Sequence, residues 1–421
     1  MIWATKTTNN YKHREIEHQR FMPHAIDPKY KPITMEHSNL FKPVQVGGMQ
    51  LKQRVVMAPL TRGRATDDNT PNKDGMAVEY YGQRSQAPGT LIITESAYIS
   101  EQAGGYANVP GLYNNKQMAA WKHVFDKIHE NESYVFVQLW SMGNQADPVF
   151  LKSKNAQFLG PVDNLYPDEQ CKNKAIECGN ELKGMTHADI EQSVADYVQA
   201  AKNAVAYGAD GVEIQAGNGY LLNQFLDPVS NKRSDKYGGS IENRSRFVLE
   251  VVDAVIAAVG AAKVGIRFSP FASHNGMSGR AEPLIVAQYS HVIGELEKRA
   301  VENLENRLAY IHLREPRVPL PNQKEIHYSD PDYSNNFVFT IWKGIVIRSD
   351  NYGLDNHTAL KDANANDRTL LAYGRYFISN PDLVYRLKHM LPLTMYDRST
   401  FYKGVSSLGY TDYPCHSAQS S

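Results

Sequence analysis

The sequence predicts an α/β protein that forms a single closed (β/α)8 TIM barrel. Eight short apolar runs occur along the chain, and amphipathic segments lie between most of them. Repeated alternation of strand and helix predicts a parallel sheet with right-handed crossovers, and eight repeats favour a closed barrel over an open doubly wound sheet. No Gly-x-Gly-x-x-Gly follows the first strand, which argues further against a dinucleotide-binding fold.

The first expected element is a hairpin at residues 44–51, where Gly47 and Gly48 join two short runs. The eight barrel strands are expected to follow at Arg54–Leu60, Thr90–Glu95, Tyr134–Trp140, Gly211–Gln215, Val264–Ser269, Leu308–Leu313, Ile345–Arg348 and Leu370–Tyr373. Such short apolar runs without regular alternation are typical of strands that are buried on both faces of a parallel sheet.

Helix signals lie between these strands. Trp121, Val124, Phe125 and Ile128 follow the i, i+3, i+4, i+7 spacing of an amphipathic helix. Residues 186–189, Thr-His-Ala-Asp, form a variant of the capping box and predict a helix that starts near residue 187. At residues 357–368 Asn and Asp interrupt the pattern, so we expect a poorly formed helix there.

The domain organisation is expected to be one barrel preceded by a polar tail. Residues 1–38 are rich in His and Asn and show no sustained period, which predicts a poorly ordered extension. Residues 39–421 are assigned to the barrel. Two long segments, Ser141–Gly184 and Glu315–Ser334, follow the third and sixth strands, and we expect them to form lids or substrate walls at the carboxyl face.

Composition excludes several other functions. Lys plus Arg and Asp plus Glu both number 45, so no net charge favours nucleic acid or an anionic membrane. No apolar run approaches the roughly 20 residues that cross a bilayer. Cys171, Cys178 and Cys415 lack metal-ligand spacing and cannot all pair internally, which predicts a reducing compartment and no metal site. The first residues show neither a signal core nor a transit-peptide composition, so the cytoplasm is the expected location.

The fourth strand carries the strongest chemical signal. After Gly211–Gln215 the chain turns through Gly217 and Gly219, so Asn218 and Tyr220 should project from the carboxyl end of the strand. Ligands bind at that end in α/β sheets. A tyrosine there can give a proton, and the amides of Gln215 and Asn218 can donate hydrogen bonds to a carbonyl.

Longer motifs extend this signal to nearly the whole chain. Residues 230–244 read SNKRSDKYGGSIENR, and five further signatures stand at strand ends: Ala58–Arg62, Pro88–Glu95, Val137–Trp140, Val264–Pro270 and Tyr373–Pro381. In this order they resemble the old yellow enzyme family of flavin-dependent ene reductases, with the closest likeness to its fungal branch. The resemblance runs from about Asn39 to Pro414.

The resemblance implies a non-covalently bound FMN that is reduced by NADPH. Thr61 would contact the flavin carbonyl near the reactive nitrogen, Gln138 would bind the pyrimidine edge, and Arg267 would stabilise the negative charge of the reduced ring. Gly374 and Arg375 would bind the phosphate, because barrels of this kind often hold phosphate after strands seven and eight.

The resemblance also assigns roles around the substrate. Tyr220 would protonate the α carbon of an unsaturated carbonyl compound after hydride reaches the β carbon, and Asn218 and Gln215 would hold the carbonyl oxygen. Trp140 and Tyr402 would shape the substrate wall. The expected partners are small enones or phenolic ligands, and both a monomer and a homodimer fit the sequence.

Two positions depart from the family pattern. Gln215 stands where the family nearly always has His, and an amide cannot become cationic. Asp350 stands where relatives carry Gly; a carboxylate that faces the phosphate would oppose binding, whereas one that faces solvent would have little effect. These departures sustain an alternative, a degenerate member that binds flavin and phenolic or steroid-like ligands with little turnover. The retained Tyr220, Thr61 and Arg267 favour the enzyme.

Overall fold

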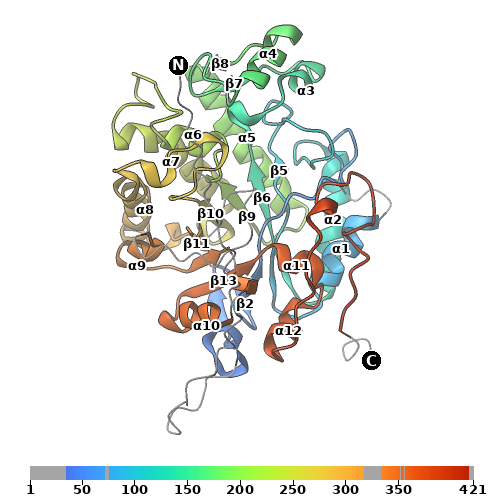
Figure 1. The fold of residues 1–421 in the computed structure, drawn as a ribbon. Helices are drawn as coiled ribbons and strands as arrows, with labels where there is room; N and C mark the ends of the chain where they lie inside the picture. Colours follow the sequence, from blue (N-terminus) through green and yellow to red (C-terminus); the bar gives the residue numbers. More distant parts are fainter. Residues whose placement is uncertain (1–34, 72–74, 317–332, 351, 355, 417–421) are drawn as a thin grey trace, which may run out of the picture. The chain divides into compact units, whose positions relative to one another are not determined.

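The computed structural model describes residues 35–71, 75–316, 333–350, 352–354 and 356–416. Eight parallel strands in these ranges close into a barrel (Figure 1). They are β3 (Val55–Met57), β4 (Leu91–Ile93), β6 (Tyr134–Trp140), β9 (Gly211–Gln215), β10 (Val264–Phe268), β11 (Tyr310–Arg314), β12 (Val346–Ser349) and β13 (Thr369–Tyr373). Because β13 also pairs with β3, the ring is complete. The predicted barrel and its eight strands are confirmed.

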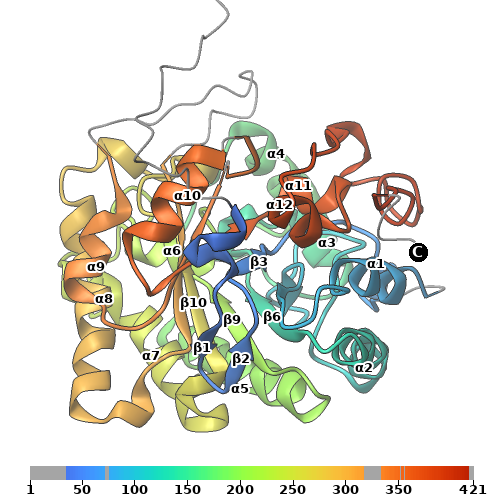
Figure 2. The same cartoon turned by 90° about the horizontal axis from the view of Figure 1, so that it is seen from below.

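Helices occupy the connections between successive strands, and α11 and α12 follow the last strand (Figures 1 and 2). They are α1 (Met76–Arg84), α2 (Asn115–Glu130), α5 (His187–Ala206), α6 (Leu221–Leu226), α7 (Ile241–Val259), α8 (Ile285–Glu302), α9 (Val338–Ile341), α10 (Asn356–Ala365), α11 (Arg375–Ser379) and α12 (Leu383–Lys388). Their apolar faces and the outward-facing strand residues form the main hydrophobic core.

Local sequence accounts for the two helices that were predicted in detail. In α2 the apolar residues of the stripe, Trp121, Val124, Phe125 and Ile128, are all fully buried. At the start of α5 the Thr186 side chain accepts from the backbone N–H of Asp189, while the Asp189 carboxylate accepts from the backbone N–H of Thr186. This reciprocal pair satisfies two amides that the first helical turn leaves unpaired.

A hairpin closes the amino-terminal end of the barrel. Strands β1 (Val44–Val46) and β2 (Met49–Leu51) pair antiparallel, as predicted, and they lie across the barrel in the view of Figure 2. Val46, Met49 and Leu51 pack against the side chains that fill the barrel interior. Gly47 has φ +53°, and a Cβ there would lie 2.1 Å from the carbonyl oxygen of Ala262, so only glycine fits this turn.

The predicted long segment Ser141–Gly184 is folded. It contains α3 (Pro148–Ser153), α4 (Glu169–Cys178) and the short paired strands β7 (Leu159–Gly160) and β8 (Lys183–Gly184), which lie together at the upper edge of Figure 1. Its apolar residues form a small core that includes Trp140, against which Tyr220 packs. The segment therefore supports one wall of the barrel mouth.

Two expectations require correction. Residues 35–38, predicted as part of the tail, belong to the folded unit: Met35 is fully buried, and the Ser38 side chain caps a 3-10 helix at Asn39–Phe41. Residues 356–365 form α10 despite their Asn and Asp content, because Ala359 and Ala363 are buried against the barrel. Residues 1–34 and most of the second long segment, 317–332, lie outside the described ranges.

No helix in the described part of the chain is long and apolar enough to cross a membrane.

Candidate active site

A cavity of about 1360 Å³ opens at the carboxyl face of the barrel. Many lining residues lie at the carboxyl end of a strand or within about five residues after it, including Thr61, Trp140, Asn218, Tyr220, Arg267, Arg314, Ser349, Gly374 and Arg375. This is the end at which barrel enzymes bind their ligands. Because one small ligand usually occupies roughly 300–1,000 Å³, the cavity can hold a large cofactor together with a second molecule.

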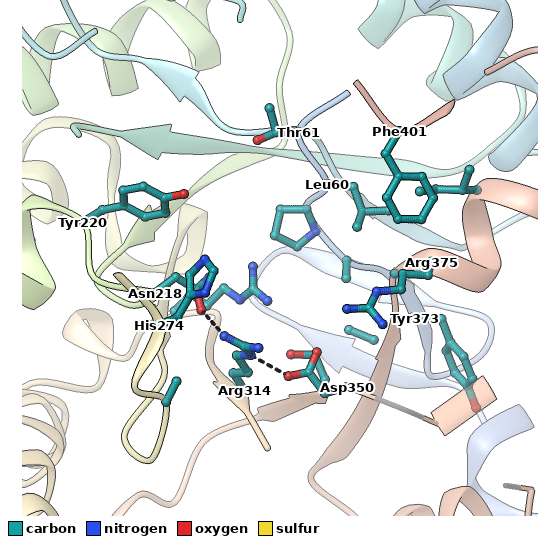
Figure 3. A pocket seen from close by; sticks show the side chains of 18 of the residues that line it. Leu60, Thr61, Asn218, Tyr220, His274, Arg314, Asp350, Tyr373, Arg375 and Phe401 are labelled. Carbon is teal, nitrogen blue, oxygen red and sulfur yellow. Dashed lines mark hydrogen bonds and ion pairs between the residues drawn. The ribbon is translucent and has the colours of Figure 1, made fainter. Parts of the chain in front are cut away.

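Tyr220 lies in one wall of this cavity, and its hydroxyl points inward (Figure 3). The residue is the N-cap of α6, and its ring meets Trp140 edge to face with 4.7 Å between centroids. Burial raises the pKa of Tyr220 to about 12, although a hydrogen bond with Asn275 partly opposes this shift. The phenol therefore keeps its proton at neutral pH and is positioned as a donor.

Asn218 is held in a left-handed conformation, with φ +58°, by bonds on three sides. Its backbone N–H donates to Ser269 Oγ at 2.6 Å, and its carbonyl oxygen accepts from Asn275 Nδ2 at 2.9 Å. Its side-chain Oδ1 accepts from Arg314 Nη1 at 3.1 Å (Figure 3). Since the amide oxygen is engaged with Arg314, the Nδ2 group is the end of the amide that can donate to a ligand.

Two predicted ligand contacts, Gln215 and Gln138, are not among the residues that line the cavity. Gln215 ends β9 and is almost fully buried, and its Oε1 has no hydrogen-bond partner in the described ranges. The amide of Gln138 is engaged at both ends: Nε2 donates to Glu213 Oε1 at 2.6 Å, and Oε1 accepts from Ser96 Oγ. Gln138 can therefore contact a ligand only by sharing or exchanging these bonds.

Arg267 supplies a buried positive charge at the cavity. Its Nε is buried and has no hydrogen-bond partner among the described residues. Burial lowers the pKa of Arg267, while the charge of Glu213 opposes that shift. Glu213 in turn accepts from His312 Nδ1 at 2.8 Å; burial alone would raise its pKa, but His312 and Arg267 outweigh burial and lower it. A guanidinium with an unused buried N–H suits a ligand that brings acceptor atoms.

Gly374 and Arg375 lie where β13 leads into α11, and Arg375 is on the opposite side of the cavity from Tyr220 (Figure 3). A Cβ at Gly374 would lie 3.2 Å from Leu60 Cδ2, so a side chain here would crowd the loop after β3. The Arg375 guanidinium lies 5.8 Å from the centre of the Tyr396 ring, to whose hydroxyl Nη1 donates at 3.4 Å. Its forked donors are thus held at the cavity edge.

The remaining predicted residues also line the cavity. Thr61 follows β3 and is partly buried, and Trp140 ends β6 beneath the Tyr220 ring. Tyr402 is 73% exposed and therefore forms part of the rim. The backbone thus brings eight of the ten predicted site residues to one cavity, the two glutamines excepted.

The carboxylate of Asp350 is paired with an arginine, an arrangement that the sequence did not predict. Asp350 has φ +97°, and its Oδ2 accepts from Arg314 Nε at 2.8 Å. Arg348, two residues before Asp350 on β12, forms a separate buried ion pair, with 2.6 Å between its Nε and Glu315 Oε1.

Sequence reasoning missed Arg314 and His274, which both line the cavity. The predicted sixth strand ended at Leu313, one residue before Arg314, and so hid the fact that this arginine ends β11. A strand boundary one residue later would have placed Arg314 at the carboxyl end of the strand, where barrel enzymes bind their ligands. His274 lies in an irregular segment with no periodic pattern, and no sequence signal marks it.

With this geometry in view, comparison with known proteins identifies the family. The model of the NADH:flavin oxidoreductase / NADH oxidase family matches residues 39–394. The chain belongs to this family. Enoate reductase 1 from Kluyveromyces lactis is 51% identical over 388 residues, 92% of this chain and 96% of the relative. A probable NADPH dehydrogenase from Candida albicans is 43% identical, covering 89% of this chain and 91% of the relative.

Among solved structures, the old yellow enzyme from a Pichia species is 43% identical, with a TM-score of 0.84, and the match covers 92% of this chain and 95% of that one. The predicted resemblance is confirmed: the chain is an FMN-dependent enzyme of the old yellow enzyme type, similar to enoate reductases and NADPH dehydrogenases. The residues present fit FMN, since the cavity offers the unused buried N–H of Arg267 and the forked donors of Arg375.

Proposed function

We propose that this enzyme uses NADPH to reduce the carbon–carbon double bond of α,β-unsaturated carbonyl compounds, with Tyr220 as the proton donor. The position of Tyr220 is the main support for this proposal, because its hydroxyl points into the cavity that Asn218 and Arg267 also line. A proton donor, a carbonyl-binding amide and a buried positive charge at one cavity suit the reduction of a polarised alkene.

FMN, when bound, supplies the hydride that adds to the β carbon of the alkene. Tyr220 then gives its phenolic proton to the α carbon. Because burial raises the pKa of Tyr220 to about 12, it is a weak acid, and the carbon it protonates must carry substantial negative charge. The Nδ2 group of Asn218 stabilises that charge by donating to the carbonyl oxygen, where most of it develops.

Arg267 and Thr61 act on the cofactor side of the cavity. The permanent positive charge of Arg267 would stabilise the negative charge of the reduced flavin. Thr61 would offer its hydroxyl as a donor to the flavin carbonyl near the reactive nitrogen. Trp140 excludes water from the substrate side and fixes the Tyr220 ring by its edge-to-face contact at 4.7 Å.

One observation supports the alternative, a ligand-binding protein with little turnover. Gln215 does not line the cavity, and its buried Oε1 has no partner among the described residues, so the amide that replaces the usual imidazole is a poor second donor to the substrate. The position of Tyr220 favours the enzyme, because a protein that only binds its ligand needs no proton donor in the cavity.

The products of an NADPH-driven reaction test the proposal. We expect the protein, NADPH and cyclohexenone to yield cyclohexanone, since proton and hydride add across the carbon–carbon bond. Gas chromatography separates this ketone from cyclohexenol, the product of carbonyl reduction. The reaction is run without oxygen, because oxygen would also reoxidise the reduced flavin. Formation of cyclohexenol, or failure of the enone to sustain NADPH consumption beyond one equivalent per flavin, would contradict the proposal.

A further inference from the structure

Arg314 lies between Asn218, which follows β9, and Asp350, which follows β12, and its side chain forms a hydrogen bond with each of them. The residue ends β11 and pairs in register with Ser349 of β12, so its backbone position is fixed by the sheet. Its Nε donates to Asp350 Oδ2 at 2.8 Å, and its Nη1 donates to Asn218 Oδ1 at 3.1 Å (Figure 3). One side chain therefore joins the loop after strand seven to the loop after strand four.

The contact with Asn218 decides which end of that amide faces a ligand. A side-chain amide can rotate by 180° and exchange its donor and acceptor ends at little steric cost. A guanidinium offers donors only, so it selects the orientation in which Oδ1 faces Arg314 and Nδ2 is left for the substrate. Without Arg314, Oδ1 of Asn218 could face the substrate carbonyl oxygen, and the two oxygen atoms would repel each other.

The contact with Asp350 decides the charge near the cofactor phosphate. Asp350 follows β12 on the loop predicted to bind phosphate, and its carboxylate is only 23% exposed. A partly buried negative charge opposes a phosphate more strongly than a solvated one, because screening is weaker. The Arg314 guanidinium, 19% exposed, offsets that charge at 2.8 Å.

We infer that Arg314 is a positioning residue with two effects: it orients the Asn218 amide as a donor to the substrate carbonyl, and it neutralises Asp350 so that the adjoining loop accepts the FMN phosphate. The first effect rests on the proposed function of Asn218, whereas the second requires only that FMN binds. Asp350 anchors the guanidinium, so the arginine and the aspartate form one unit.

A double-mutant cycle separates the two effects. Arg314→Met removes the charge and the donors but keeps a long side chain, and Asp350→Asn removes only the charge, because Asn tolerates the positive φ of 97° as well as Asp. Two dissociation constants are measured for each variant: that of FMN for the apoprotein, from quenching of flavin fluorescence, and that of phenol for the holoprotein, from the change in flavin absorption.

We expect Arg314→Met to weaken the binding of both ligands. FMN should bind roughly tenfold more weakly because the Asp350 carboxylate loses its partner, and phenol roughly five- to tenfold more weakly because the Asn218 amide loses its fixed orientation. The double variant should regain parental FMN affinity, since no unpaired charge remains, while its phenol affinity stays low. The FMN effect of Arg314→Met should also shrink as salt is raised, whereas the phenol effect should not.

A matched control is Arg299→Met. It breaks a similar pair with Asp253, at 2.7 Å, on the outer helices α8 and α7, and it should leave both constants unchanged. Unaltered FMN and phenol binding in Arg314→Met would overturn the inference. So would a double variant in which FMN affinity stays as low as in Arg314→Met. Because neither readout depends on turnover, a failure of enone reduction is distinguishable from a failure of this inference.

Discussion

Replacing Tyr220 with Phe should slow the reoxidation of the reduced enzyme by cyclohexenone by roughly 10²–10⁴-fold, the usual contribution of a positioned general acid. Reduction of the flavin by NADPH should continue at nearly the parental rate, because hydride transfer to the cofactor needs no proton on carbon. Stopped-flow absorption measures the two half-reactions separately. The Phe ring keeps the edge-to-face contact with Trp140, so the shape of the cavity is preserved.

Molecular oxygen provides the internal control for this variant. Oxygen accepts electrons without a proton on carbon, so the reduced Phe variant should still reoxidise in air at close to the parental rate. If cyclohexenone reoxidises the variant as fast as the parent, Tyr220 is not the proton donor.

Gln215→His should act in the opposite direction to Tyr220→Phe. The imidazole replaces an amide whose Oε1 has no partner among the described residues, and it restores the second donor that the resemblance predicts. We expect a rate gain in enone reduction of up to roughly 10²-fold, the range that one such donor contributes. A parent that turns over no enone, together with a His variant that does not improve, would favour the ligand-binding alternative.

Replacing Arg375 with Ala should yield a largely flavin-free protein. Each hydrogen bond to a charged group stabilises a complex by about 1.5–3 kcal/mol, so loss of a forked pair to phosphate should raise the FMN dissociation constant by roughly two orders of magnitude or more. The ratio of visible flavin absorption to protein absorption measures occupancy directly.

Arg375→Lys and Arg398→Ala are the matched controls. The lysine keeps the charge but loses the fork, so its flavin occupancy should fall between those of the parent and the Ala variant. Arg398 is an exposed arginine at the cavity rim, and its removal should leave occupancy unchanged. Parental occupancy in Arg375→Ala would remove the assignment of the phosphate site.

The sequence predicted the barrel well because each of its signals is local. The short apolar runs of the strands, the stripe of α2 and the capping box of α5 each depend on residues within a few positions of one another, and all are present in the structure. The positions of Tyr220, Asn218 and Arg375 could also be predicted, because they follow strands and the carboxyl ends of parallel strands meet at one face.

Interactions between distant residues could not be predicted in this way. Gln138 is bound by Ser96 and Glu213, and Asp350 by Arg314, partners that are 36 or more positions away. No periodicity or spacing marks such pairs. The same holds for α10. Its polar sequence predicted a poor helix, but in the structure its alanines are buried against the barrel. Sequence patterns located the site, whereas the partners of its side chains required the structure.

We propose that one flavin site takes electrons from NADPH and passes them to an enone. An anaerobic titration of the purified protein tests it most directly. We predict a yellow protein whose visible absorption is bleached by one equivalent of NADPH and restored by one equivalent of cyclohexenone. A protein that binds no FMN, or a reduced flavin that stays bleached with cyclohexenone and other enones but is restored by oxygen, would contradict this proposal.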